Sequence, residues 1–499
     1  MQTADERDSL KKHDVNGLGN FSRQWVLLRD SDRFDLDWVV RRVTPSTILY
    51  THPALDVVSI DDEFRLGSKL LVLGIALFAD QPDDDFVAVL KSKLRSSNGD
   101  IAAGVIQMSG TYVVVHCFGD EVELYTDPGG LRGVYYKDGR AASTPQLLPY
   151  IERDDNLDHV FPFGKPDEWY PGDLCPYVGT KALLANHRLM LGEGRIERFW
   201  PTGFLPSLDV ERASEAAAAL MRGAVRSAVK RWKVICSITG GKDTRVCLAA
   251  SRPVADHIEF FTIRSPRTHP CDMNYPDMLA STFRLNHRFV DTTVAGLELL
   301  ERYDLQTGGM SVGERREIIG ACHQLAGRNV VHLNGNLGAM IKAYYWHRRH
   351  PSSIRKSSLL REFVHKPRAL RDAVDRWFDT LPDLDARTAY NLMYLENRGR
   401  WASMSETGSQ LFYDSLTPFN NRQVFELLSA VSSRSLAGVT LHERLVRQMW
   451  PGLLEVPYCR GSRRWSKLIP MSQRAFLKAA ARRFGSIVSQ NTAEEGCRK

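Results

Sequence analysis

The sequence predicts an α/β protein in which a β-rich N-terminal part precedes a parallel sheet wrapped by helices. Two observations indicate this order. Short β-type runs, bounded by glycine or acidic turns, fill residues 101–136. Strand and helix signals then alternate from residue 234 to residue 333, which is typical of a parallel sheet. From Ser352 onward the pattern is mainly helical.

The N-terminal part is expected to hold several short strands and one helix. The strands are expected at 25–28, 57–60, 70–77, 103–106, 111–116, 122–126 and 134–136. Three aspartates at 83–85 are expected to open a helix that runs through Lys93. A strong turn signal, Asp-Pro-Gly-Gly at 127–130, precedes the last of these strands.

A linker rich in proline, glycine and serine at 201–208 separates two expected domains, residues 1–200 and 208–485. The second domain is expected to open with an alanine-rich helix at 209–231 whose apolar residues have helical spacing. Strands are then expected at 234–238, 258–263, 288–290 and 330–333, and helices at 244–251 and 272–283.

Composition places the chain among ordinary soluble proteins, with 43% hydrophobic and 25% charged residues in 499 and a net charge of +7. We expect no membrane span, because no long uncharged apolar run occurs. The polar N-terminus lacks a signal sequence, so a cytoplasmic location is expected.

The eight cysteines are scattered with no CxxC pair, which indicates reduced thiols and neither a zinc nor a redox motif.

Basic residues are concentrated near the C-terminus, in the segment 460–484, which contains no acidic residue. Two interpretations stay open. The segment could be a solvated helical face, or it could bind an acidic partner such as a nucleic acid, a carrier phosphopantetheine or an anionic glycan.

The most informative segment is Ser237–Arg245, which lies between an apolar run and a helix-like run. Its paired glycines, Gly240 and Gly241, let backbone N–H groups approach an oxyanion closely. The helix start adds unpaired donors and a partial positive charge. This arrangement predicts a phosphate-binding loop, although a glycine turn in a buried core is the alternative. The spacing of a Walker-type loop is absent, so a kinase or GTPase is disfavoured.

Other side chains of this segment suit the same chemistry. Thr239 and Thr244 can donate from their hydroxyls, and Asp243 could hold a magnesium ion between phosphate oxygens. The alternatives are a helix N-cap for Asp243 and a solvated loop position for Lys242.

The segment resembles the SGGxDS pyrophosphate loop of the ATP pyrophosphatase (PP-loop) superfamily, with Thr239 and Thr244 in place of the two serines. Residues 331–345 and 416–422 extend the resemblance to the asparagine synthetase family over about 208–460. They stand where that family has a strand with an "SGEGxDE" turn and an "R.PFLD" segment. The resemblance implies a parallel-sheet PP-loop ATPase domain, with ATP and Mg²⁺ as cofactors and Asp243 as metal ligand. It implies ATP contacts from Ser237, Thr239, Gly240, Gly241, Lys242, Asp243, Thr244, Ile263, Gly335 and Asn336.

The N-terminal part resembles the glutaminase-type domain of the same family, which implies an Ntn-hydrolase-like, β-rich α+β fold. The matching residues are Gly110-Thr111-Tyr112, Asp127, Gly129, Tyr135-Tyr136 and the stretches 183–189 and 198–200. Gln2 stands where the family has its catalytic cysteine. The resemblance therefore implies a degenerate amidotransferase-like domain without glutaminase activity.

The second block departs from the family, because Asn336, Ala339 and Met340 stand where it has three acids. The metal site would lack a ligand unless Asp272, Asp277 or a water replaces it. The family's pyrophosphate-binding lysine is also not obvious, and Lys242, His442 and Arg444 are candidates. We expect Asp243, Lys242 and His442 to be catalytic, with a purely structural role as the alternative for His442. Glu314, Glu317 and Glu396 are candidate bases for the amine proton, with surface charges as the alternative.

The resemblance implies an ATP-dependent carbon–nitrogen ligase that forms an amide through an acyl-adenylate and releases AMP and pyrophosphate. Its substrates would be a small-molecule or peptide carboxylate and an amine. β-Lactam synthetases and lasso-peptide cyclases are relatives that lack the N-terminal cysteine. Two alternatives stay open: a catalytically inactive relative that binds a nucleotide or a partner in a biosynthetic pathway, and an adaptor that binds a carrier protein or nucleic acid.

Overall fold

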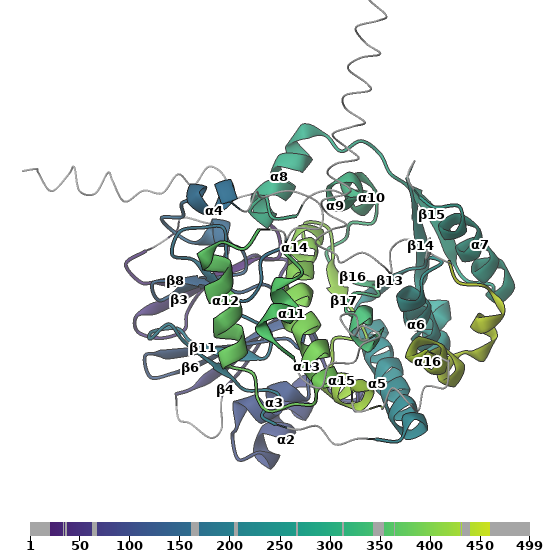
Figure 1. Ribbon diagram of the computed structural model, residues 1–499, viewed down its shortest axis with the longest axis horizontal. Coiled ribbons are helices and arrows are strands. Elements are labelled where there is room, and N and C mark those ends of the chain that lie inside the picture. Colours follow the sequence, from purple (N-terminus) through teal and green to yellow (C-terminus); the bar gives the residue numbers. More distant parts are fainter. Residues whose placement is uncertain are drawn as a thin grey trace, which may run out of the picture.

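The computed structural model describes residues 20–459, apart from 33, 35–36, 62–66, 161–168, 204–207, 266–267, 312–313, 343–353, 364, 430 and 432–439 (Figure 1). Gln2 and the basic segment 460–484 therefore lie outside the described residues. None of the helices within these ranges has the length and apolar character needed to cross a membrane.

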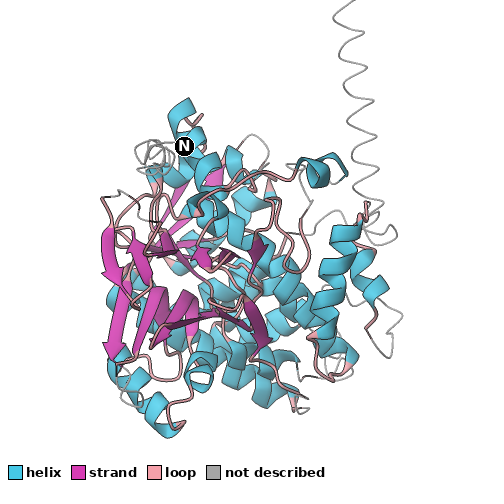
Figure 2. Ribbon diagram, turned by 90° about the vertical axis from the view of Figure 1, so that its left-hand side faces the viewer, coloured by secondary structure: helices cyan, strands magenta, loops and turns pink. Residues whose placement is uncertain are grey.

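Two antiparallel six-stranded sheets form the N-terminal part, and Figure 2 views the molecule from their side. The first sheet has the order β10 (Lys181–Ala182), β8 (Tyr135–Lys137), β9 (Arg140–Ala142), β1 (Trp25–Arg29), β3 (Thr47–Thr51), β2 (Val39–Arg42). The second has the order β12 (Arg195–Arg198), β11 (His187–Met190), β7 (Glu121–Thr126), β6 (Ser109–Phe118), β5 (Lys69–Leu77), β4 (Val57–Asp61). Alternate apolar side chains of both sheets share one buried cluster, which includes Trp25, Leu49, Leu73 and Val113.

The strand expected at 103–106 is wrong, because these residues belong to the helix α3 (Ile101–Ile106). Asp100 caps this helix by accepting a hydrogen bond from the Ala102 N–H at 2.9 Å. Ile101 and Val105 are buried one turn apart, and the Tyr112 hydroxyl donates to the Val105 carbonyl. A cap and a helical burial pattern outweigh the β propensity of this short apolar run. The preceding helix α2 (Phe86–Ser96) and the other expected N-terminal strands are present.

A parallel five-stranded sheet follows, with the order β15 (His287–Asp291), β14 (Glu259–Arg264), β13 (Lys233–Ser237), β16 (Val330–Leu333), β17 (Asp414–Leu416). Four of these strands lie where the sequence predicts them, and β17 is the one that it does not reveal. The helices α5 (Val210–Arg231), α6 (Lys242–Ala250) and α16 (Leu441–Met449) pack against one another beside β13 (Figure 1). The chain is thus a mixed α/β protein with an antiparallel β-rich region and a parallel sheet.

Further helices lie between the strands of this sheet and after them, as the helical pattern after Ser352 predicts, and a few short ones lie in the N-terminal part. The α-helices are α4 (Asp155–Val160), α7 (Cys271–Phe283), α8 (Leu297–Thr307), α9 (Glu314–Glu317), α10 (Ile319–Gln324), α11 (Lys356–Leu360), α12 (Arg368–Asp379), α13 (Ala386–Met393), α14 (Arg400–Ser409) and α15 (Arg422–Ser429). The 3₁₀ turns are η2 (Pro145–Leu147), η3 (Arg252–His257), η4 (Gly338–Lys342) and η7 (Pro451–Glu455), and η5 (Tyr394–Gly399) is a π-helix.

Buried polar contacts join the β-rich region to the parallel-sheet region. The Arg422 guanidinium, which is fully buried, donates to Asn186 Oδ1 at 2.8 Å and to the Thr126 carbonyl at 2.8 Å. The Glu396 carboxylate accepts both ends of the Arg198 guanidinium, at 2.6 and 2.7 Å, and the Trp377 indole N–H at 2.7 Å. The largest apolar cluster also takes residues from both regions. The described parts of residues 1–200 and 208–485 therefore pack as neighbours with a continuous core.

The cysteines differ in part from the expectation of reduced thiols. Five of the cysteines are free and buried, which agrees with that expectation: Cys117, Cys175, Cys236, Cys247 and Cys322. Cys271 and Cys459 instead form a disulfide across a sequence separation of 188 residues. No spacing signal marks a pair so distant along the chain, because only the folded chain brings the two residues together.

The buried Glu396 provides a test of the join between the two regions. Burial raises the pKa of Glu396, but the Arg198 charge and its hydrogen bonds outweigh this effect, and the pKa lies below its ordinary value. We expect Glu396→Gln to lower the free energy of unfolding by about 3 kcal/mol, since it leaves Arg198 buried without its counter-charge. Urea unfolding measures this loss, and Glu455→Gln, at an exposed position, is the matched control.

The same lowered pKa fixes the sign of the pH dependence. A carboxyl group with a lowered folded-state pKa stabilises the fold above its unfolded pKa, and this stability is lost as the pH falls through the folded pKa. The stability difference between the parent chain and Glu396→Gln should therefore shrink at pH values below about 4. An unchanged difference at low pH would contradict the assignment.

Candidate functional site at the carboxyl edge of the parallel sheet

A cavity of about 380 Å³ lies where the central strands of the parallel sheet end. Such an edge is where open parallel sheets bind ligands. Strand β13 contributes Ser237, β14 contributes Phe261–Ile263, and α14 contributes Ser405, Glu406 and Ser409. Seven of the ten residues expected to contact ATP line this cavity: Ser237, Thr239, Asp243, Thr244, Ile263, Gly335 and Asn336.

The cavity has a polar side and an apolar side. Hydroxyls, amides and carboxylates face it from the loop after β13, the turn after β16 and α14. Its apolar and aromatic side is formed by Phe261, Ile263, Tyr303, Ile318, Ile319, Phe412 and Tyr413. A ligand with a flat apolar part and a polar or charged part fits this division.

The loop after β13 holds two hydroxyls together. Thr239 Oγ1 lies 2.9 Å from Thr244 Oγ1 and accepts the Gly241 N–H at 3.0 Å. Helix α6 starts at Lys242, and Gly241 is its N-cap, so Asp243 is not the N-cap that the structural alternative proposes. Thr239 and Thr244 therefore present their hydroxyls to the cavity beside the start of α6.

Gly240 lies outside the cavity lining, which differs from the expected role as a phosphate contact. Its N–H donates to Asp272 Oδ1 at 2.8 Å, and its carbonyl accepts the Cys459 N–H at 2.9 Å. A Cβ added at this position would clash with the Cys459 sulfur. Gly240 is thus required by close approach to Cys459, and its amide is already bonded to a carboxylate.

Lys242 also points away from the cavity lining. Its ammonium group pairs with Glu443 Oε1 at 2.7 Å and donates to Thr440 Oγ1 at 3.2 Å. Burial raises the pKa of Glu443, but the hydrogen bonds from Lys242 and Thr440 outweigh this and hold the pKa below its ordinary value. In this conformation Lys242 fastens α6 to the start of α16, and it is not a solvated loop lysine.

Asp243 is the centre of contacts from three separate segments. Its Oδ1 lies 2.7 Å from Nε2 of His442, a buried residue of α16. A Cβ added at Gly338 would lie 2.6 Å from the same oxygen, and one at Gly335 would lie 2.9 Å from the Asp243 Cβ. The structure therefore brings the first block, the altered turn and His442 together.

Glu406 is a site residue that sequence reasoning missed. Its buried carboxylate accepts the Asn334 side-chain amide at 3.3 Å and the side-chain amide of Asn336. Asn334 Oδ1 in turn accepts the Asn336 N–H at 3.0 Å. Glu406 lies in a helix with no motif, about 70 residues after the turn that it contacts, so no sequence signal marks it.

Other candidate acids take different places. Asp272 is bonded to Gly240, Asp277 is exposed on α7, and Glu396 is buried against Arg198. The Glu396 carboxylate is bonded to Arg198 and Trp377 and is not among the residues that line the cavity, so its role as a base stays a prediction. Glu317 is exposed and outside the lining, and the Glu314 side chain lies outside the described residues.

Comparisons with known proteins do not place the chain in a family. No family model and no curated protein matches it. Among solved structures, it matches one described as the allosteric regulatory enzyme of purine biosynthesis, with 11% identity over 74% of this chain and 77% of that chain, at a TM-score of 0.19.

The contact between Asp243 and His442 can be measured by a double-mutant cycle. We expect Asp243→Asn and His442→Gln to couple by about 1–2 kcal/mol in the free energy of unfolding, because the two groups share a short hydrogen bond at a partly buried site. Urea unfolding of the two single variants and the double variant gives the coupling. Additive effects within about 0.3 kcal/mol would show that the contact is absent in solution.

Proposed function

We propose that the chain is an ATP-dependent carbon–nitrogen ligase of the asparagine synthetase type. In this reaction a substrate carboxylate displaces pyrophosphate from ATP to give an acyl-adenylate, and an amine then displaces AMP to give an amide. The observation that carries the proposal is the single cavity that collects seven of the ten expected nucleotide contacts at the carboxyl edge of the sheet.

The cavity lining suits the two parts of ATP. The aromatic and aliphatic side, which includes Phe261, Tyr303 and Phe412, offers flat apolar surface for the adenine ring. Thr239 and Thr244 offer hydroxyl donors to phosphate oxygens near the start of α6, where the helix dipole favours negative charge. A cavity that excludes water strengthens these contacts and holds the reacting groups together.

The residues present fit a magnesium ion. Asp243 and Glu406 both line the cavity, and carboxylate oxygens are the ligands that Mg²⁺ prefers. Glu406 would supply, from α14, one of the carboxylates that Asn336, Ala339 and Met340 do not. When bound, the ion neutralises charge on the phosphate oxygens. His442 would hold the Asp243 carboxylate in place through its 2.7 Å contact.

The N-terminal part would be a degenerate amidotransferase-like domain with an Ntn-hydrolase-like fold. Its two packed antiparallel six-stranded sheets support this assignment. With Gln2 in place of the catalytic cysteine, the nitrogen would come from ammonia or from a substrate amine.

A catalytically inactive, nucleotide-binding relative is the second candidate. Two observations favour it. The Gly240 amide is bonded to Asp272, whose negative charge would repel a phosphate there, and Lys242 is paired with Glu443. An active enzyme would have to rearrange both contacts when ATP binds.

Nucleotide binding tests the shared part of both candidates. We expect isothermal titration calorimetry to detect binding of α,β-methylene-ATP with Mg²⁺ to the full chain. Asp243→Asn should weaken binding at least tenfold, because it removes a charge from the proposed ion site. A tenfold loss of affinity corresponds to about 1.4 kcal/mol of binding free energy. Asp256→Asn, which alters an exposed aspartate, is the control that should bind normally.

Pyrophosphate exchange then separates the two candidates. An active ligase incorporates labelled pyrophosphate into ATP when a suitable carboxylate is supplied, and Asp243→Asn abolishes the incorporation. Binding without exchange across a broad panel of carboxylic acids would favour the inactive relative. An absence of nucleotide binding by the parent chain would overturn both.

A further inference from the structure

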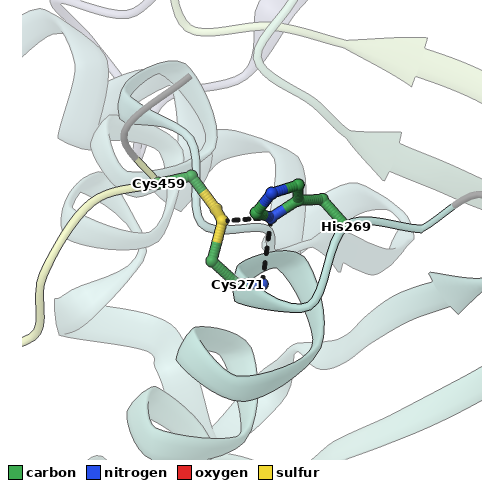
Figure 3. A group of neighbouring side chains, drawn as sticks. All are labelled: His269, Cys271 and Cys459. Atoms are coloured by element: carbon green, nitrogen blue, oxygen red, sulfur yellow. Dashed lines mark hydrogen bonds between the residues drawn. A yellow bond between two sulfur atoms is a disulfide. The ribbon is translucent and has the colours of Figure 1, made fainter. Parts of the chain in front are cut away.

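Three side chains with metal-ligating atoms gather on the outer side of the loop after β13. They are His269, Cys271 and Cys459, and their ligand atoms all lie within 4.8 Å of one another (Figure 3). Nδ1 of His269 lies 2.9 Å from the Cys271 sulfur, and the same nitrogen accepts the Cys271 N–H at 3.2 Å. The second contact identifies Nδ1 as the nitrogen that carries a lone pair, and this lone pair would leave the Cys271 N–H to bind an ion beside the sulfur.

A carboxylate stands beside this group without belonging to it. Asp272 Oδ1 lies 3.6 Å from the Cys459 sulfur, but it accepts the Gly240 N–H at 2.8 Å. Asp272 is not among the residues whose ligand atoms all lie within 4.8 Å of one another. The three other side chains therefore leave one position of a zinc tetrahedron to a water molecule.

We propose that His269, Cys271 and Cys459 bind Zn²⁺ when the two cysteines are reduced, with a water molecule as the fourth ligand. Two thiolates and one imidazole are ligands that select zinc over the hard cations Mg²⁺ and Ca²⁺. In the structure the two sulfurs are joined as a disulfide, which is the oxidised form of the same site. Reduction breaks the S–S bond and gives two thiols: a dithiol supplies two electrons and two protons and becomes a disulfide, whereas a phosphine supplies two electrons and becomes the phosphine oxide, with water supplying the oxygen and the protons. Zinc binding then releases the two thiol protons to solvent.

The site is accessible to an ion from solvent. His269 is exposed, and Cys271 and Cys459 are each partly exposed. The five other cysteines that the structure describes are free and buried, so none of them competes for the ion at the surface.

Zinc at this position would act on the phosphate-loop candidate through Cys459. The Cys459 N–H donates to the Gly240 carbonyl, and Asp272 accepts the Gly240 N–H. The preceding segment is already fixed, because the buried Arg245 guanidinium donates to the carbonyls of Leu453 and Val456, at 2.8 and 2.9 Å. A bound ion would therefore hold Cys459 against Gly240, whereas the segment through Val456 is already held by Arg245. Zinc binding does not depend on the proposed ligase function.

The test is the zinc content of the full chain. Protein is reduced with a phosphine, which removes the disulfide without adding thiol ligands, exposed to Zn²⁺ and desalted. Mass spectrometry of the metal should then find about one zinc per chain, and competition with a chromophoric chelator gives its affinity.

We expect Cys271→Ser and Cys459→Ser to weaken zinc binding by at least tenfold, and His269→Ala likewise, because each removes a ligand. Cys117→Ala, in the β-rich region, should bind zinc as the parent chain does.

Cobalt substitution gives a second, spectroscopic readout of metal binding. It uses only the parent chain, so it does not depend on whether a variant folds. Reduced parent protein with Co²⁺ should show a thiolate-to-metal charge-transfer band, and the oxidised protein should show none because its sulfurs are bonded to each other. The proposal is overturned if the reduced parent chain takes up no zinc. It is equally overturned if Cys271→Ser and Cys459→Ser, shown to be folded by circular dichroism, retain the parent affinity.

Discussion

The contact between Asp243 and His442 is the constraint on which the candidate site depends. It ties the start of α6, at the centre of the parallel sheet, to α16, about 200 residues later in the chain. Gly335 and Gly338 allow the turn after β16 to approach Asp243 closely, because a Cβ at Gly338 would overlap its carboxylate and a Cβ at Gly335 would overlap its Cβ and backbone. Asp243 therefore lies in a contact of three segments at the edge of the cavity.

The wider fold supports that arrangement through buried charge. Arg245 anchors the segment before Cys459 by hydrogen bonds to backbone carbonyls, and its guanidinium lies 4.6 Å from the Tyr458 ring centre. Burial lowers the pKa of Arg245, and the backbone carbonyls accept hydrogen bonds from the two terminal nitrogens of its guanidinium. On the other side of the sheet, Asp414 of β17 pairs with Arg132 and Arg23 from the β-rich region. Since charged groups so deeply buried are costly without partners, both regions are needed to pair these charges.

Local patterns predicted most of the fold, and long-range contacts explain what they missed. The alternation after residue 234 predicted four parallel strands and the loop at their edge, because strand and helix periods are read from neighbouring residues. Residues 103–106 were misassigned as a strand, because the cap at Asp100 makes this short apolar run helical. Glu406, the place of Asp272 on Gly240 and the pairing of Cys271 with Cys459 depend on approaches between distant segments, for which one sequence carries no periodic signal. The roles of Asp243, His442 and Lys242 in chemistry stay predictions.

The central claim is that the cavity beside Thr239 and Thr244 receives the phosphates of ATP. A crystal structure of the full chain with α,β-methylene-ATP and Mg²⁺ tests it most directly. The account predicts adenine against the Phe261 side of the cavity and the α- and β-phosphates beside the two threonines, with Asp243 facing the ion. Nucleotide absent from this cavity at saturating concentration, with Asp272 still bonded to Gly240, would contradict it.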